Sequence, residues 1–345
     1  MTIMRDEILE QGGIVARLAG DPEPYRAAAA EARAAGARFV LYAARGTSDN
    51  AAVYGKYLAT ILAGLPAGLA VPSAATVYDA DIDFRDCLVI GISQSGETPD
   101  VAEYLAQARD GGAHTLAITN DAASLLARAA HGTLATGAGR ERAVAATKTY
   151  SSQLAALALF WAAWTGEDRL TASLAGAVPA AMEAALAVEE RIVEIAARLS
   201  HADRLLVTGR GYNYATALET ALKVKETCYL AAMPFSAADL MHGPIAVVEP
   251  RYPVLLYAAP GKTLAGMLEL EAELRRRDAE TFVVAGAGTP VPAPATTLRV
   301  PLDLPEELTP LVTALPGQLL ALHLSLARGL DPDTPRGLSK VTKTY

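Results

Sequence analysis

The chain has 345 residues, of which 52% are hydrophobic and 20% charged, so it can hold two domains and is too apolar for a disordered protein. Its formal net charge of -8 would repel a phosphate backbone, which argues against nucleic-acid binding. The two cysteines have no CxxC spacing, which is typical of reduced thiols in a cytoplasmic protein. The N-terminus lacks an apolar signal core, and the most apolar run, residues 154–164, is shorter than the roughly 20 residues that span a bilayer. We therefore expect a soluble, cytoplasmic protein with no membrane partner.

The order of apolar and helical patterns predicts an α/β fold. The first 20 residues hold room for one helix, and residues 38–44, 87–93 and 114–120 are apolar runs of strand length. A helical pattern between the last two runs starts at Thr98-Pro99, where Thr can cap the free N–H groups and Pro suits the first helical position. Strands that alternate with helices are typical of a parallel sheet.

The second half of the chain repeats the first. "RFVLYAARGTSDNAAVYGKYL" resembles "DRLLVTGRGYNYATALETALK", and residues 87–119 resemble residues 253–285 at nearly the same spacing. We therefore predict two tandem domains, each a parallel sheet flanked by helices in three αβα layers. The predicted segments are an N-terminal helical segment 1–34, a first domain 35–165, a helical connector 166–200, a second domain 201–330 and a C-terminal tail 331–345.

A loop rich in hydroxyl groups, "SQSGET", follows the strand at residues 87–93. Such a loop is either a plain capped turn or a cradle for an anion, since free N–H groups at a helix start attract phosphate. It lacks the Lys of a Walker A motif, so one phosphate monoester fits better than a nucleoside triphosphate. The second copy has "APGKT" at this place, which favours a binding site over a requirement of the fold.

Three charged residues, Glu219, Lys223 and Glu226, lie at spacings of four and three and so share one face of a helix. Taken alone, they are typical of an ordinary ion pair on a solvated surface. Small and apolar residues flank them, however, and the helix follows the strand and turn "VTGRG" of the repeat. A carboxylate in that place could act as a general base.

The remaining motifs indicate no specific function by themselves. His242 precedes Gly-Pro, as turn residues often do, and none of the five histidines has metal-ligand spacing, so we expect no metal and no cofactor. The last 15 residues resemble a frayed basic tail by composition.

"ISQSGETPD" resembles the phosphate loop of sugar isomerase (SIS) domains. From "RGTSDN" to "PRGLSKVT", the duplicated arrangement resembles the isomerase half of the glucosamine-6-phosphate synthases and their deaminase relatives. Arg45 and Asp239 depart from the family's pattern, which leaves the exact sugar open. The resemblance implies a sugar-phosphate substrate in contact with Thr47, Ser48, Ser93, Gln94, Ser95, Thr98, Val144, Ala146 (a Ser in the synthases), Glu219, Lys223 and Ser339.

The same resemblance implies the catalytic roles. Glu226 matches the residue that shuttles the proton, with Glu219 and Lys223 in support. His242 matches the residue that opens the sugar ring, and because it reaches the neighbouring subunit in the synthases, a homodimer is implied. Lys340 matches the lysine that attacks the open-chain ketose, and its amine is a nucleophile only once it is unprotonated.

No Cys precedes Cys87, so we expect no hydrolysis of glutamine. The expected reaction converts glucosamine 6-phosphate and water to fructose 6-phosphate and ammonia. Two other reactions stay open, namely cleavage of a phosphorylated fructosamine and ammonia-dependent synthesis in the reverse direction. A non-catalytic sugar-phosphate sensor is a further alternative from a different class, because fold alone does not settle function.

Overall fold

The computed structural model describes residues 2–292 and 296–340. The chain divides into two compact units, each built around one parallel sheet. The first unit comprises residues 13–141 and 148–176 and, from residue 339, the end of the chain. The second unit comprises the residues up to 12, residues 142–147 and residues 177–338.

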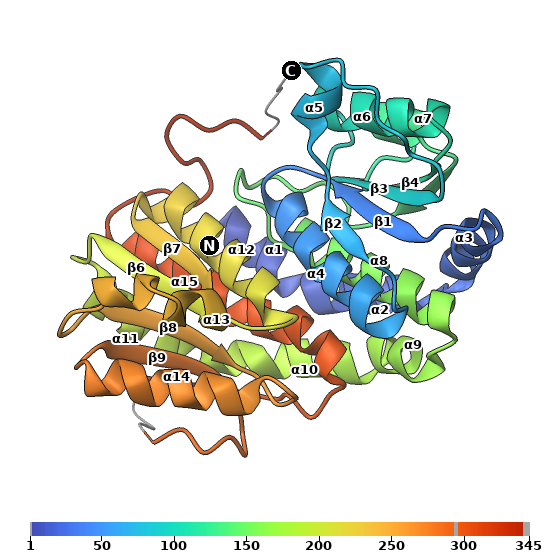
Figure 1. The fold of residues 1–345 in the computed structure, drawn as a ribbon. Coiled ribbons are helices and arrows are strands. Elements are labelled where there is room, and N and C mark those ends of the chain that lie inside the picture. The colour runs from blue at the N-terminus through green and yellow to red at the C-terminus, as the bar shows by residue number, and fades with distance from the viewer. Residues whose placement is uncertain (1, 293–295, 341–345) are drawn as a thin grey trace. The chain divides into compact units, whose positions relative to one another are not determined.

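The first unit contains a five-stranded parallel sheet in the order β2-β1-β3-β4-β5. Its strands are β1 (Phe39–Ala43), β2 (Ala67–Leu69), β3 (Cys87–Ser93), β4 (His114–Thr119) and β5 (Gly132–Ala135). Figure 1 shows α5 (Pro72–Thr76), α6 (Pro99–Asp110) and α7 (Leu125–Ala129) on one face of this sheet. The other face carries α3 (Glu23–Ala34), α4 (Thr47–Leu62) and α8 (Lys148–Thr165), so the unit has three layers.

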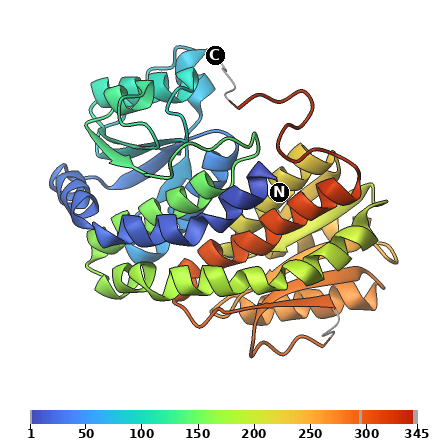
Figure 2. The ribbon, with the colours of Figure 1, turned by 180° about the vertical axis from the view of Figure 1, so that it is seen from behind.

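The second unit contains the sheet β10-β9-β8-β6-β7, also parallel throughout. Its strands are β6 (Arg204–Gly209), β7 (Ala231–Ser236), β8 (Pro253–Ala258), β9 (Glu280–Gly286) and β10 (Thr297–Val300). α13 (Ala237–Met241) and α14 (Leu264–Arg276) cover one face around an apolar core. The other face carries α12 (Asn213–Cys228) and α15 (Thr309–Ala327), and Figure 2 shows α15 alongside α10 (Ala177–Ala185) and α11 (Glu189–Leu199).

The predicted fold class is confirmed, because both sheets are parallel and both have helices on their two faces. The long central strands β1, β3 and β4 lie where the apolar runs predicted them. The sequence did not reveal the edge strands β2, β5, β7 and β10. Three of them, β2, β5 and β10, have only three or four residues, and Pro234 interrupts β7. The expectation of one helix before residue 20 was wrong, since α1 (Ile3–Leu9) and α2 (Gln11–Gly20) are separate helices.

Close packing of α12 on α15 fixes the position of α12 in the second unit. A Cβ at Gly317 of α15 would lie 2.1 Å from Thr220 Oγ1, so only glycine allows the two helices to approach so closely. The Thr313 hydroxyl donates a buried hydrogen bond of 2.6 Å to Asn213 Oδ1 at the start of α12. These contacts make α12 a rigid carrier for its side chains.

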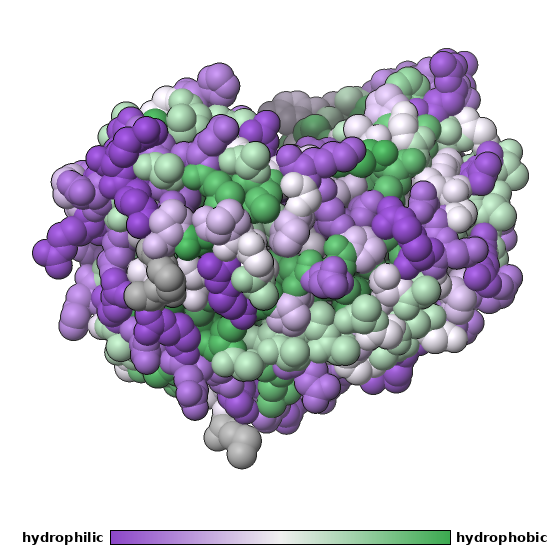
Figure 3. Space-filling model, turned by 90° about the horizontal axis from the view of Figure 1, so that it is seen from below, coloured by the Kyte–Doolittle hydropathy of each residue, from purple (hydrophilic) through white to green (hydrophobic). Residues whose placement is uncertain are grey.

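One helix among the described residues, Glu306–Ala327, is long and apolar enough to cross a membrane, and 83% of its apolar window is buried inside the structure. The pair Asp168–Ala175 and Ala177–Leu199 passes the same test only if it is counted together across a bend of 45°. On the face drawn in Figure 3, hydrophobic residues emerge in groups interrupted by hydrophilic ones.

Candidate functional site

The hydroxyl loop follows β3 at the carboxyl edge of the first sheet. Ser93 ends the strand, and its hydroxyl oxygen accepts a hydrogen bond of 3.1 Å from Gly96 N–H and lies 3.2 Å from Thr98 Oγ1. The Ser95 hydroxyl oxygen accepts from Glu97 N–H at 3.2 Å. The main-chain carbonyl of Gln94 accepts from Asn120 N–H at 3.1 Å, which ties the loop to the end of the neighbouring strand β4. Ser93, Ser95 and Thr98 are therefore gathered in one tight turn.

Gly96 allows this loop to fold closely over its neighbours. Its φ of +68° is a conformation that other residues rarely adopt, and a Cβ there would lie 2.0 Å from Ser124 Oγ. Its carbonyl accepts a hydrogen bond from Leu126 N–H at 3.0 Å. The close approach that Gly96 permits is thus to the first turn of α7, within the protein itself.

Thr98 occupies the N-cap position of α6, and Pro99 is the first helical residue, as predicted. The predicted capping bond was wrong, because the Thr98 hydroxyl makes no hydrogen bond to the first turn and lies against Ser93 instead. Thr98 therefore leaves the first-turn N–H groups of α6 without a side-chain cap. Together with the positive end of the helix dipole, they favour an anion at this place.

Thr47 and Ser48 begin α4 directly after β1, which pairs with β3 at this edge of the sheet. The preceding Gly46 has a φ of +58° and turns the chain into the helix. Gln153 of α8 donates a buried hydrogen bond of 2.9 Å from Nε2 to Ser48 Oγ. The starts of α4 and α6 thus open on the same edge of the first sheet.

An ion pair that the sequence did not predict joins these two helix starts. Arg45 Nη2 lies 2.6 Å from Asp100 Oδ2, and Nε donates to the same oxygen at 2.9 Å. Asp100 is buried in the first turn of α6, whereas the Arg45 guanidinium is half-exposed. Burial raises the pKa of Asp49 in the first turn of α4, and the nearby Arg45 charge opposes that rise. The departure of Arg45 from the family's pattern was the sequence feature that could have revealed this pair.

The charged residues of α12 form a buried cluster in the second unit. Lys223 Nζ lies 2.5 Å from Glu226 Oε2 and 3.5 Å from Glu219 Oε1. The side chains of Lys223 and Glu219 are 1% and 2% exposed, while that of Glu226 is 25% exposed. A solvated surface pair is thereby excluded. Burial of charges is costly unless they are paired, so the cluster holds Glu226 in place and leaves part of its carboxylate accessible.

The other predicted residues of the second unit belong to other segments of the chain. His242 follows α13, and its exposed side chain makes no hydrogen bond to any described residue. Val144 donates its N–H to the carbonyl of Asp333 at 3.2 Å, and Ala146 lies in the same segment, 142–147. No group of three or more His, Cys, Asp or Glu in the described part of the chain could hold a metal ion.

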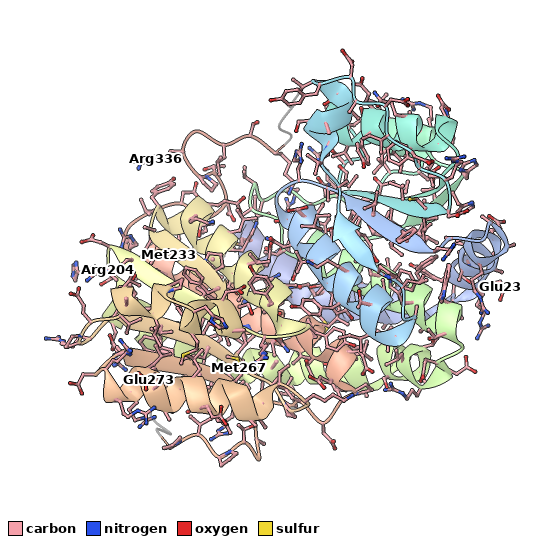
Figure 4. All side chains as sticks on the ribbon, viewed as in Figure 1. Glu23, Arg204, Met233, Met267, Glu273 and Arg336 are labelled. Atoms are coloured by element: carbon pink, nitrogen blue, oxygen red, sulfur yellow. The ribbon has the colours of Figure 1, made fainter. Side chains whose placement is uncertain are left out.

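Arg336 and Lys340, both in the predicted C-terminal tail, make contacts in different units. In the second unit, Arg336 N–H donates to the Tyr229 hydroxyl at 2.6 Å, and the guanidinium (labelled in Figure 4) lies 4.2 Å from the centre of that ring. Ser339 and Lys340 belong to the first unit, where Lys340 Nζ donates to Glu141 Oε2 at 2.9 Å. No motif in the sequence singled out Glu141.

Both sheets match the same protein-family model. The SIS domain matches residues 35–163 and 198–328, which together exceed half of the chain. The chain belongs to the SIS-domain family. The SIS match covers both sheets and includes the hydroxyl loop of the first and helix α12 of the second.

Named relatives of this SIS chain include glutamine–fructose-6-phosphate aminotransferases. That of Gloeobacter violaceus is 37% identical over 98% of this chain and 58% of its own length. That of Methanothermobacter thermautotrophicus is 39% identical over 87% of this chain and 51% of its own length. The chain thus spans little more than half of these relatives.

Solved structures agree with the SIS match. The C-terminal domain of glucosamine-fructose-6-phosphate aminotransferase from Francisella tularensis has a TM-score of 0.88 at 27% identity, covering 97% of this chain and 98% of that one. A protein from Silicibacter pomeroyi assigned as a phosphosugar isomerase has a TM-score of 0.87 at 35% identity, covering 96% and 100%. Glucosamine-6-phosphate deaminase from Thermotoga maritima has a TM-score of 0.80 at 20% identity, covering 99% and 100%, a likeness of fold.

Proposed function

We propose that this chain is an aminosugar-phosphate isomerase and deaminase that converts glucosamine 6-phosphate and water to fructose 6-phosphate and ammonia. The observation that carries the proposal is the buried cluster on α12, in which Lys223 holds the partly exposed Glu226 carboxylate at 2.5 Å. Such an arrangement supplies a fixed proton acceptor, which an aldose–ketose conversion needs. The names of the relatives with 37% and 39% identity add fructose 6-phosphate as the substrate class.

The hydroxyl loop would bind the phosphate group. Ser93, Ser95 and Thr98 present hydroxyl groups in one turn, and Thr98 leaves the first-turn N–H groups of α6 uncapped by its side chain. Hydroxyl and N–H donors with the positive end of a helix dipole suit one phosphate monoester. Binding energy from this remote group would then hold the reacting carbons in place.

The chemistry would need three side chains. His242 would open the sugar ring by moving a proton to the ring oxygen. Glu226 would take the proton from C2 and return it at C1, while O1 gains a proton and the amine nitrogen loses one, which turns the 2-amino aldehyde into a 2-imino alcohol. Water adds to that imine and ammonia leaves, giving the ketose. Lys340 would contact the open chain, and no step above needs it to form a covalent bond.

A test of the proposal replaces Glu226 by Gln, which keeps the shape and removes the base. We expect kcat for ammonia release from glucosamine 6-phosphate to fall about 10²–10⁴-fold with KM nearly unchanged. Lys225→Gln, one residue earlier and exposed, is the matched control and should keep kcat. If Glu226→Gln releases ammonia as fast as the control variant, Glu226 has no role in the mechanism. If the unaltered chain releases no ammonia from glucosamine 6-phosphate, the proposed reaction is wrong.

A second candidate reaction, cleavage of a phosphorylated fructosamine, is favoured by Arg45. Its half-exposed guanidinium pairs with Asp100, which follows the hydroxyl loop in the chain. This guanidinium would suit a carboxylate on the amine substituent of such a substrate. Ammonia and amine release should be measured with aminosugar and fructosamine phosphates together. Arg45→Ala should then lower kcat/KM only for the carboxylate-bearing fructosamine, if that is the substrate.

We further propose a cytoplasmic homodimer in which His242 faces the second copy. Two exposed hydrophobic residues, Met241 and Val247, lie beside this exposed histidine and are suited to an interface. Sedimentation should give twice the chain mass, and Met241→Asp with Val247→Asp should give the single chain mass. A monomeric unaltered chain would contradict this proposal.

A further inference from the structure

Glu141 is a buried carboxylate that the roles above do not use. Its side chain is 0% exposed, and it precedes the segment that leads into α8. Thr149, in the first turn of α8, donates to it twice, from N–H at 3.1 Å and from the hydroxyl at 2.6 Å. Lys340 donates to it from Nζ at 2.9 Å.

The contact with Lys340 differs from the two with Thr149. Thr149 is eight positions from Glu141 in the chain, so the turn before α8 brings them together locally. Lys340 is 199 positions away, so only the tertiary structure can place its ammonium there. A carboxylate removed from water is costly unless charged or polar partners replace the water. The ammonium of Lys340 supplies the opposite charge that the Thr149 donors do not.

We propose that Glu141 is the positioning residue for Lys340, holding this residue in the first unit and fixing its ammonium before a sugar phosphate binds. A role of Lys340 in contact with the substrate rests on the function proposed above, whereas the ion pair between Glu141 and Lys340 does not. The Lys340 side chain is 25% exposed, so the amine stays accessible while it is held. Glu141 thus acts on the reaction through Lys340 and needs no contact with the substrate.

Amine labelling of the full chain tests the holding without any substrate. N-acetoxysuccinimide acetylates unprotonated lysines, and mass spectrometry reads Lys340 beside the exposed Lys262 as an internal reference. We expect Glu141→Gln to speed acetylation of Lys340 about tenfold or more, because it removes a charge-assisted hydrogen bond, with Lys262 unchanged. Thr149→Val, which removes a donor to the same carboxylate, should leave Lys340 protected. The proposal would be overturned if Lys340 were acetylated at the same rate in the unaltered chain and in Glu141→Gln. It would also be overturned if Thr149→Val accelerated Lys340 acetylation as much as Glu141→Gln does.

Kinetics on glucosamine 6-phosphate then test whether Glu141 acts through Lys340. Glu141→Gln should lower kcat in the unaltered background and have no further effect in the Lys340→Met background. A structural role at the start of α8 would instead lower kcat by the same factor in both backgrounds, and that result would overturn the proposal. If no chain turns over any sugar phosphate, the proposed reaction fails, and the labelling result alone decides on Glu141.

Should Glu141→Gln not fold, the same pair can be tested from the other side. Lys340→Met removes the ammonium, and Lys340→Arg restores a cation that cannot serve as an amine. We expect a lower melting temperature for Lys340→Met and recovery in Lys340→Arg. Equal melting temperatures for Lys340→Met and the unaltered chain would overturn the proposal.

Discussion

Replacing Lys223 by Met removes the cation of the buried cluster on α12 and leaves most of the side-chain volume in place. Glu219, 2% exposed, then loses a partner at 3.5 Å, and Glu226 loses one at 2.5 Å. Two carboxylates would face each other without the positive charge that separates them.

The magnitude follows from the burial of these groups. Removing one partner of a buried ion pair costs about 3–5 kcal/mol, against about 0–1 kcal/mol for an exposed pair. Because the Lys223 side chain is 1% exposed and Glu219 is equally enclosed, the larger figure applies. A loss of that size lowers the melting temperature by on the order of 10 °C in a protein of this size.

Thermal unfolding followed by circular dichroism measures the effect, with ammonia release measured on the same samples. The matched control is Lys225→Met, because Lys225 lies two residues on in the same helix and is exposed. It should change the stability by no more than about 0.5 kcal/mol. The double variant Glu219→Gln, Lys223→Met should recover part of the loss, since it also removes a buried negative charge. At about 2–4 °C per kcal/mol, a difference of only about 1–2 °C corresponds to less than about 1 kcal/mol. A melting temperature of Lys223→Met that close to the control would therefore refute the reasoning.

Three further predictions concern other parts of the chain. Gly96→Ala should raise KM for the sugar phosphate more than it lowers kcat, because a φ of +68° and a contact of 2.0 Å with Ser124 would distort the loop; an unchanged KM would contradict this. The hydrogen bond from Arg5 holds the pKa of Glu189 below its usual 4.5. This carboxylate therefore stabilises the folded state above pH 4.5 and loses that effect as the pH falls through its lowered pKa. Urea unfolding should show the unaltered chain more stable than Glu189→Gln at pH 7 and the difference shrinking towards pH 3; a constant difference would refute it. Burial raises the pKa of the Cys228 thiol to about 11, so iodoacetamide at pH 8 should label it only after unfolding, and rapid labelling of the folded chain would contradict that.

Local pattern was sufficient for the central strands and for the chemistry of the loop. A strand buried on both faces is mostly apolar, so the runs LVIGI in β3 and LAI in β4 made these strands recognisable. The edge strands β2 and β5 have only three and four residues and are partly exposed, so neither is long enough to stand out as such a run. Thr98 and Pro99 fixed where α6 begins, yet the direction of the Thr98 hydroxyl depended on Ser93, a neighbour in space.

The spacing of Glu219, Lys223 and Glu226 determined that they share a helix face, because α-helical geometry brings residues three and four apart together. Whether that face meets water or protein was decided by the tertiary structure, in which Lys223 and Glu219 are enclosed. That difference separates a weak surface pair from a costly buried cluster, because the energy of a charge depends on its surroundings more than on its neighbours in sequence. The contact of Glu141 with Lys340 belongs wholly to the tertiary structure, since no local pattern can join residues 199 positions apart. The sequence by itself thus determined which groups are present and in what order, and folding decided which of them are paired and removed from water.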